Sequence, residues 1–243
     1  MVEMAPRQQA DLKVGDIIDK TAAVVSANLV PAVVFLVVFT ALGTATDLFL
    51  LRMQEQLLVA GTTPDMGSAM QVQMQTSLIS IAVAIATIVG VYLLLRTMLE
   101  RLGQLSGGGH HRFLAFIGLS IVSGIGTALG LILLIIPGLI IMARWSIAPS
   151  MLLVEGKGVF ATLGESWAKT KGHEFPIILA AVAMLILFYA IAFLPALVLS
   201  DLGTLAAVVS RIGSTAATVV STGLGVALFT MLAGKTNLAG TFE

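Results

Sequence analysis

The chain has 243 residues, of which 58% are hydrophobic and only 11% charged, and its mean hydropathy is +1.03. A soluble domain is about 45–50% apolar and about 25% charged, because it must cover its core with polar groups. These values exclude the soluble globular, disordered and coiled-coil classes. Lys and Arg (13) balance Asp and Glu (13), which excludes a strongly basic nucleic-acid surface, and the absence of Cys excludes disulfides and thiolate metal sites. An all-α integral membrane protein with several spans remains.

Apolar stretches of span length recur along the chain. A helix needs about 20 mostly apolar residues to cross a hydrocarbon layer of about 30 Å. We predict a bundle of six transmembrane helices, at about residues 27–49, 78–98, 114–136, 139–154, 175–200 and 203–234. They form one membrane domain over residues 27–243, preceded by a cytoplasmic amphipathic segment over residues 1–26. The acidic residues ahead of the first long apolar stretch argue against a cleaved signal peptide.

The uncharged run from Phe113 to Ala143 is too long for one span and contains Ile136, Pro137 and Gly138. Proline removes a backbone donor and clashes with the preceding turn, and glycine adds a flexible joint. We therefore predict two helices joined by a tight hairpin at this point. The alternative is one helix kinked at the proline, which gives five spans.

The distribution of Lys and Arg separates the two topologies, because cytoplasmic segments are enriched in these residues. Five spans would place Lys157, Lys169 and Lys171 outside. Six spans with both termini inside place Arg7, Lys13, Lys20, Arg96, Arg101, Arg112, Lys157, Lys169, Lys171 and Lys235 in the cytoplasm, against Arg52 and Arg211 on the outer side. The six-span topology is favoured, and the expected location is a bacterial inner membrane.

Two segments have helical amphipathic patterns and are predicted to lie on the cytoplasmic membrane surface. In the first, six residues form an apolar stripe: Val14, Ile17, Ile18, Thr21, Val24 and Val25. In the second, over residues 158–171, the stripe is Phe160, Leu163 and Trp167. Helices of this kind lie in the headgroup plane with their apolar face toward the lipid.

Arg144 lies on the predicted fourth span, and Glu155 ends it. An intramembrane Arg costs about 2.5–3.5 kcal/mol to insert and usually faces the bundle or snorkels. We weigh an anion or lipid-phosphate contact for Arg144 against snorkelling to the outer headgroups or a bond to a carbonyl at the broken hairpin, and favour the structural role. For Glu155 we favour a cap or an ion pair with Lys157 or Lys169.

Asp47, Asp201 and Arg211 are expected to cluster toward the outer face. An Asp–Arg pair there could line a shallow vestibule, although each residue could equally end its helix in water. The outer loop at about residues 51–77 is rich in Gln and Met, and a short irregular or helical cap is expected.

Small residues recur at every fourth position on the last span, at Gly213, Ala217, Ser221 and Gly225. Such a stripe lets two helix backbones approach closely. It fits packing inside the monomer, and a homo-oligomer contact is the alternative.

No motif for catalysis, cofactor binding or metal binding is present. The adjacent His110 and His111 fall short of the three or four ligands that a metal site needs, and no acidic or Cys partner lies nearby. The expected catalytic, cofactor and metal sites are therefore none, and the chain is not expected to be an enzyme.

One region resembles a known family. Its features are a Pro-Gly hairpin at Pro137 and Gly138, Arg144 on the following span, Glu155-Gly156 at the end of that span, and Ser166-Trp167 on a basic surface helix. Together with the opening Val14 to Ile18, these features resemble the glycerophosphoryl diester phosphodiesterase membrane-domain-like group, which includes the YciC-like bacterial inner-membrane proteins. The resemblance implies a six-helix bundle of undefined physiological role. Some relatives carry a fused phosphodiesterase domain, which is not found in this sequence, so the hydrolase activity is not carried over.

The expected function is that of a non-enzymatic inner-membrane protein acting as a lipid-associated or partner-binding module. Its expected partners are membrane lipids, other membrane proteins and a second copy of the chain, with no nucleic acid. The candidate lipid or polar contacts are Arg144, Glu155, Ser166, Trp167 and Arg211. The alternative is a small transporter or channel with a polar path near Asp47, Arg144, Asp201 and Arg211, but transporters usually place several polar groups at mid-membrane, and these spans carry few.

Overall fold

The computed structural model describes residues 12–59, 66–105, 112–198 and 203–237, and all of its regular elements in these ranges are α-helices. In chain order they are α1 (Val14–Ala27), α2 (Leu29–Val59), α3 (Met66–Arg101), α4 (Phe113–Leu133), α5 (Ile135–Arg144), α6 (Ala148–Glu155), α7 (Val159–Lys169), α8 (Glu174–Val198) and α9 (Gly203–Asn237). The predicted all-α class is confirmed.

Within the described residues, five helical segments are long and apolar enough to span a membrane: Leu29–Glu55, Met70–Arg101, Phe113–Leu133, Ile135–Glu155 and Leu205–Leu232. The bent pair α7–α8 would be a sixth spanning segment if it is counted as one span, and its two helices meet at an angle of 100°. The protein is therefore an all-α membrane bundle with five or six helices of spanning character. The sharp bend is what a surface helix leading into a span requires.

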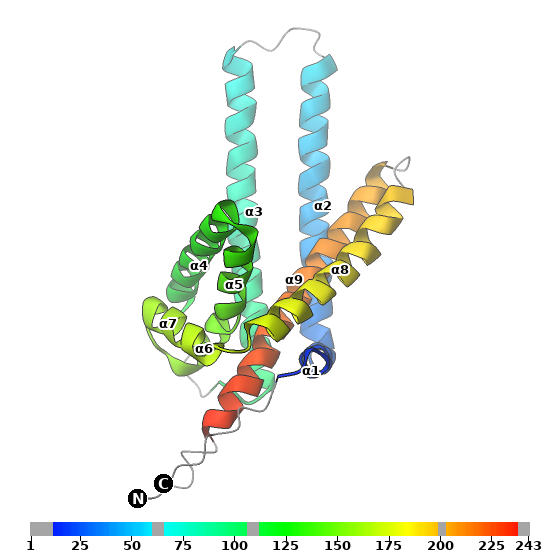
Figure 1. Ribbon diagram of the computed structural model, residues 1–243. Coiled ribbons are helices and arrows are strands. Elements are labelled where there is room, and N and C mark those ends of the chain that lie inside the picture. Colours follow the sequence, from blue (N-terminus) through cyan, green and yellow to red (C-terminus); the bar gives the residue numbers. More distant parts are fainter. Residues whose placement is uncertain (1–11, 60–65, 106–111, 199–202, 238–243) are drawn as a thin grey trace, which may run out of the picture.

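The helices form three antiparallel pairs (Figure 1). The long pair α2–α3 stands upright, the shorter hairpin α4–α5 lies beside the lower part of α3, and the tilted pair α8–α9 leans against α2. Helices α1, α6 and α7 lie at the lower end, where α1 crosses beneath α2. The pair α2–α3 extends well beyond the tip of α4–α5, because both of its helices continue into the segment expected to be a cap.

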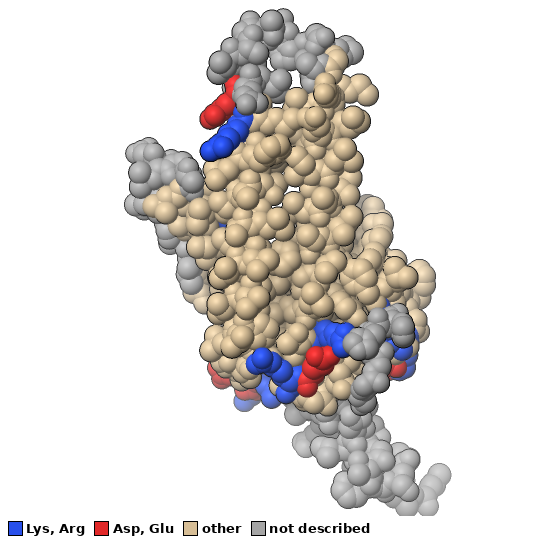
Figure 2. Space-filling model, turned by 180° about the vertical axis from the view of Figure 1, so that it is seen from behind, with Lys and Arg blue, Asp and Glu red and all other residues tan. Residues whose placement is uncertain are grey.

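Charged side chains gather at the two ends of the molecule, and an almost uncharged band separates them (Figure 2). The lower end carries most of the charge on this face. A band without charge is what a hydrocarbon layer selects, because a charged side chain at its centre costs several kcal/mol.

The amphipathic helices do not both present their apolar face to lipid. On α1, Ile17, Thr21 and Val24 are buried inside the protein, where they pack against α8 and α9. On α7, Leu163 is also buried by protein, whereas Phe160 is 77% exposed and Trp167 40%. The expectation that Leu163 shares a lipid-facing stripe with these two aromatics is therefore wrong. Apolar periodicity locates the buried face of a helix but does not say whether protein or lipid covers it.

The hairpin turn lies earlier than the sequence suggested. Helix α4 ends at Leu133, Leu134 is extended with φ −161° and ψ 135°, and α5 begins at Ile135. Pro137 thus lies in the first turn of α5, where its missing N–H would have no helical partner. Gly138 permits the close approach of α4, since a Cβ there would lie 2.7 Å from the backbone nitrogen of Leu131.

A second break divides the segment expected to be one span over residues 139–154. Residues 145–147 form a turn between α5 and α6, and Pro149 lies in the first turn of α6. A proline at this position cannot donate to a carbonyl of the preceding turn, so it ends α5 and permits a change of direction. Pro149 was the sequence signal for this break.

Candidate functional site

Arg144 lies at the lower end of α5, away from the hairpin tip, and it is 8% exposed. Its Nη1 donates to the backbone carbonyl of Trp167 over 2.8 Å, and its Nη2 pairs with the carboxylate of Glu174. The guanidinium also lies over the Trp167 ring, 5.1 Å from the centroid. The carbonyl that binds Arg144 therefore belongs to α7 and not to the hairpin. Arg144 holds α5, α7 and the start of α8 together.

The backbone carbonyl of Arg144 completes this junction. It accepts a hydrogen bond from Ser166 Oγ at 2.6 Å. Thr170 Oγ1 lies 3.2 Å from the same carbonyl, but its single proton is closer to the Ser166 carbonyl, at 2.7 Å. Both hydroxyls are buried. The Arg144 carbonyl lies in the last turn of α5, where helical carbonyls lack an intrahelical partner, so the Ser166 hydroxyl acts as a side-chain cap. Arg144, Ser166 and Trp167, which the sequence singled out separately, thus form one structural cluster.

Glu155 belongs to a neighbouring network of ion pairs. It pairs with Lys157 at 2.9 Å and with Lys169 at 2.7 Å, the two partners expected from the sequence. Glu165 also pairs with both lysines. The hydrogen bond from Lys157 holds the pKa of Glu165 below its ordinary value, and the two carboxylates hold the pKa of Lys157 above its own. The network fixes α7 against the end of α6.

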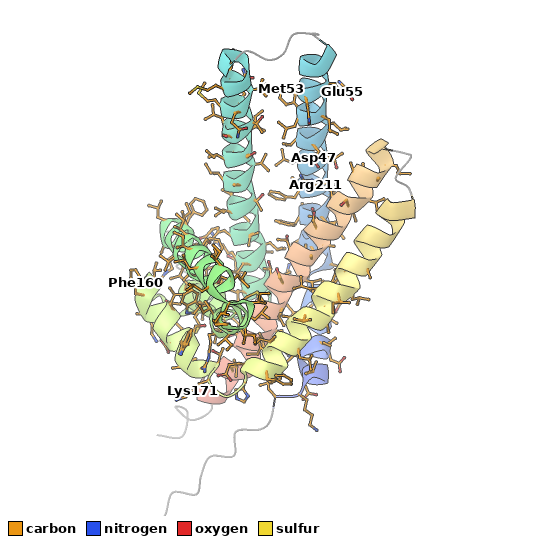
Figure 3. All side chains as sticks on the ribbon, turned by 45° about the horizontal axis from the view of Figure 1, so that its top comes forward. Asp47, Met53, Glu55, Phe160, Lys171 and Arg211 are labelled. Carbon is orange, nitrogen blue, oxygen red and sulfur yellow. The ribbon has the colours of Figure 1, made fainter. Side chains whose placement is uncertain are left out.

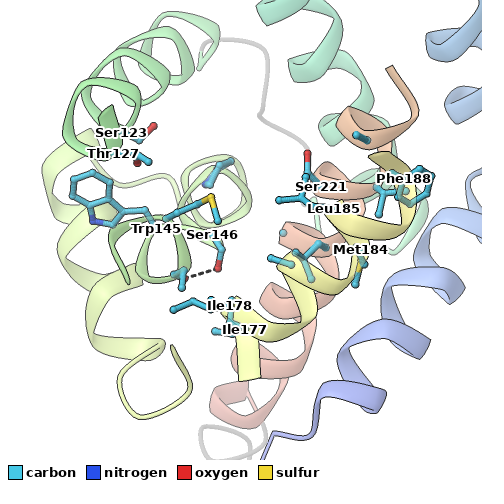
Figure 4. A pocket seen from close by; sticks show the side chains of 18 residues that line it. Ser123, Thr127, Trp145, Ser146, Ile177, Ile178, Met184, Leu185, Phe188 and Ser221 are labelled. Carbon is cyan, nitrogen blue, oxygen red and sulfur yellow. Dashed lines mark hydrogen bonds between the residues drawn. The ribbon is translucent and has the colours of Figure 1, made fainter. Parts of the chain in front are cut away.

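An apolar cavity of about 380 Å³ lies between the α4–α5 hairpin and the α8–α9 pair (Figure 4). Aliphatic and aromatic side chains dominate its lining, including Trp145, Met184 and Phe188. No charged residue is among the described residues that line it. Three of its hydroxyls, on Ser123, Ser146 and Ser221, already donate to backbone carbonyls three residues earlier in the chain. An occupant would therefore meet an almost entirely apolar wall.

The small-residue stripe of α9 contributes to this cavity. Ala217, Ser221 and Gly225 line it, whereas Gly213 is buried one turn above. At Gly225 an added Cβ would lie 2.9 Å from the carbonyl oxygen of Ser146. The lower end of the stripe thus permits a close approach between α9 and the α5–α6 turn, and its middle leaves open space.

A second cleft, of about 250 Å³, lies between α2, α3 and α9. Asp47 of α2 and Arg211 of α9 face each other beside it (Figure 3), and they form a two-point ion pair with both N–O distances at 2.5 Å. Gly43 gives the stem of Arg211 room to cross α2, since an added Cβ would lie 3.0 Å from Arg211 Cδ. The hydroxyls of Thr87, Ser214, Thr215 and Thr218 also line the cleft.

The structure separates the candidate residues into two groups. Arg144 lies with the first residue of α8, whereas Arg211 lies near the start of α9. Because α8 and α9 are antiparallel, these positions are at opposite ends of the pair (Figure 1). Among the described residues, Arg144 and Arg211 therefore do not belong to one site. Asp201, His110 and His111 lie outside them.

Sequence reasoning did not identify Glu174 as the partner of Arg144, nor the cavity between the two hairpins. The sequence signal for Glu174 was its position at the start of a span, because a carboxylate is favourable at the positive N-terminal end of a helix. The cavity has no local signal, because its described lining comes from five helices, α4, α5, α6, α8 and α9, and from the α5–α6 turn.

No family model matches the chain, and no curated protein or solved structure matches it. The resemblance to the phosphodiesterase membrane-domain group therefore stays a prediction.

Proposed function

We propose that this membrane protein is a non-enzymatic lipid-binding module that holds a lipid acyl chain in the cavity between α4–α5 and α8–α9. The observation that carries the proposal is the cavity itself, about 380 Å³ in volume and with no charged side chain among the described residues that line it. Its volume lies in the range of about 300–1,000 Å³ that is typical of small-molecule sites. An acyl chain is the apolar molecule in greatest supply around a membrane helix.

The composition of the α4–α5 hairpin supports this occupant. Its tip is made of exposed aliphatic residues, from Leu131 to Ile136. A tip of this composition favours hydrocarbon over water, which leaves the upper side of the cavity bordered by lipid tails.

The cytoplasmic orientation and the inner-membrane location belong to the same proposal. They rest on the excess of Lys and Arg at the lower end, which the positive-inside rule places in the cytoplasm. The ion-pair network of Glu155, Lys157, Glu165 and Lys169 then lies at the inner surface, with the exposed Phe160 and Trp167 at headgroup depth.

Filling the cavity tests the proposal. Ala181 lines it from α8, so Ala181→Phe is expected to occupy the space that an acyl chain would take. The measurement is lipid retention by the purified full chain, by native mass spectrometry at matched detergent concentration. We expect retention to fall at least fivefold, since a bound chain would lose much of its apolar contact.

Ala128→Phe is the matched control. Ala128 lies on α4, is exposed and does not line the cavity. It makes the same chemical change within a spanning helix, so we expect retention equal to that of the unmodified protein. Equal retention by both variants would show that the cavity does not hold the lipid.

A further inference from the structure

The cleft between α2, α3 and α9 has a polar end and an apolar end. Arg211, which pairs with Asp47 beside the cleft, lines the polar end, and the stacked rings of Phe35 and Phe39, whose centroids are 4.4 Å apart, line the other end. The distance from Leu29 to Asp47 along α2 is roughly 27 Å, so the ion pair lies near one boundary of a hydrocarbon layer of about 30 Å. Under the positive-inside orientation this is the outer boundary.

The ion pair retains unused hydrogen-bonding capacity. Asp47 engages Nε and Nη2 of Arg211, so Nη1 stays available as a donor, and each carboxylate oxygen keeps a further lone pair. Thr215 is 7% exposed and lines the cleft, and its hydroxyl makes no hydrogen bond in the part of the chain that the structure describes. The oxygens of Ser214 and Thr218 also stay available as acceptors, because these hydroxyls donate to helix carbonyls.

One continuous face of α9 connects this cleft with the apolar cavity. Ser214 and Thr218 line the cleft, and Ala217 and Ser221 line the cavity. Ser214 and Ser221 are both exposed, and they are two turns apart, or about 10 Å. A polar site near the boundary is thus followed, about 10 Å deeper along α9, by an apolar one. A phospholipid has the same order of groups.

We propose that the cleft binds the headgroup of a zwitterionic phospholipid from the outer leaflet, with its phosphate at Arg211 and its primary ammonium at Asp47 and the neighbouring hydroxyls. This inference rests on the proposed function, because the acyl chain of the same lipid occupies the apolar cavity. The neutral ion pair offers one cation and one anion, which complement the two charges of a zwitterion. An anionic headgroup would bind Arg211 but would leave Asp47 repelled.

Lipid binding by the purified full chain tests the inference, with three probes: phosphatidylethanolamine, phosphatidylglycerol of the same acyl composition, and soluble glycerophosphoethanolamine. We expect the unmodified protein to prefer phosphatidylethanolamine. Arg211→Gln and Asp47→Asn are expected to lower its binding roughly tenfold or more, the effect of losing one charge-assisted hydrogen bond. Arg52 lies at an exposed position on α2, the helix that carries Asp47. Arg52→Gln is therefore the control, and we expect it to bind lipid as the unmodified protein does.

Thr215→Val keeps the inference falsifiable if the charge variants fail to fold, because it removes only a hydroxyl at nearly constant shape. We expect a several-fold loss of phosphatidylethanolamine binding with little change for phosphatidylglycerol. Binding of the soluble probe comparable to that of the intact lipid would overturn a lipid as the source of the headgroup. A preference for phosphatidylglycerol, or unchanged binding in all three variants, would overturn the headgroup site.

The two proposals fail in different ways. If Ala181→Phe retains both lipids, the acyl-chain cavity is wrong and the headgroup inference falls with it. If Ala181→Phe loses both lipids while the Arg211, Asp47 and Thr215 variants keep the selectivity of the unmodified protein, only the headgroup inference is wrong.

Discussion

The guanidinium of Arg144 lies over the indole of Trp167, 5.1 Å from its centroid, and its Nη1 donates to the Trp167 backbone carbonyl over 2.8 Å. The same guanidinium pairs with Glu174. One side chain at the end of α5 therefore fixes the position of the surface helix α7 and of the span α8 that follows it. Stacking on the indole while donating to a carbonyl and pairing with a carboxylate requires a planar cationic group with several donors.

Arg144→Lys is expected to destabilise the protein although it keeps the charge. A single ammonium cannot stack on Trp167 and donate in the same directions as the guanidinium fork. We expect a loss of about 1.5–3 kcal/mol in the free energy of unfolding, the contribution of a hydrogen bond to a charged group. Denaturant titration of the detergent-solubilised protein measures it, with Arg52→Lys at an exposed position as the control. Equal stability of both variants would contradict the clamp.

Gly138→Ala is expected to disrupt the hairpin. An added Cβ would lie 2.5 Å from Leu131 Cγ and 2.7 Å from its backbone nitrogen, so α4 and α5 would have to separate. We expect a loss of about 1–3 kcal/mol, as for other overpacked sites. Gly124→Ala on α4 is the matched control, because an added Cβ there meets nothing within 4 Å, and it should be neutral or stabilising by up to about 1 kcal/mol. Thermal unfolding of both variants gives the comparison.

The surface network predicts a pH dependence at both ends of the scale. Hydrogen bonding to Lys157 lowers the pKa of Glu165 from its ordinary 4.5, so its stabilising effect is present above that value and is lost as the pH falls through the lowered pKa. The pKa of Lys157 is raised from 10.5, so its effect is present below that value and is lost as the pH rises further.

Glu165→Gln should therefore weaken the dependence of the melting temperature on pH below about 4.5. Glu55→Gln, at an exposed position on α2, serves as the control and should leave the acid limb unchanged. A variant at Glu165 whose acid limb matches that of the unmodified protein would show that the ion pairs add nothing to stability.

The predicted topology can be tested with single cysteines, since the natural chain has none. Arg52→Cys and Lys171→Cys are both at exposed positions and are predicted to lie on opposite sides of the membrane. In intact cells a membrane-impermeant thiol reagent should label position 52 and spare position 171. Labelling of both positions from outside would exclude cytoplasmic placement of Lys171 and, with it, the six-span topology.

The sequence by itself determined the all-α membrane class, the approximate positions of the spans and the existence of a Pro-Gly hairpin. These features follow from local quantities, namely the length of uncharged apolar runs and the backbone restrictions of proline and glycine. The position of α7 was also predictable, because a short amphipathic segment next to a span has a regular apolar period.

Only the tertiary structure decided what each apolar face contacts. Ile17 on α1 and Leu163 on α7 are buried by protein, whereas Phe160, also on α7, is exposed. In a membrane the lipid tails are as apolar as a leucine side chain, so hydrophobic periodicity does not distinguish a protein neighbour from a lipid one. The same reason hides the apolar cavity from the sequence. The partner of Arg144 was likewise a tertiary outcome, because Glu174 is brought beside it by the bend between α7 and α8.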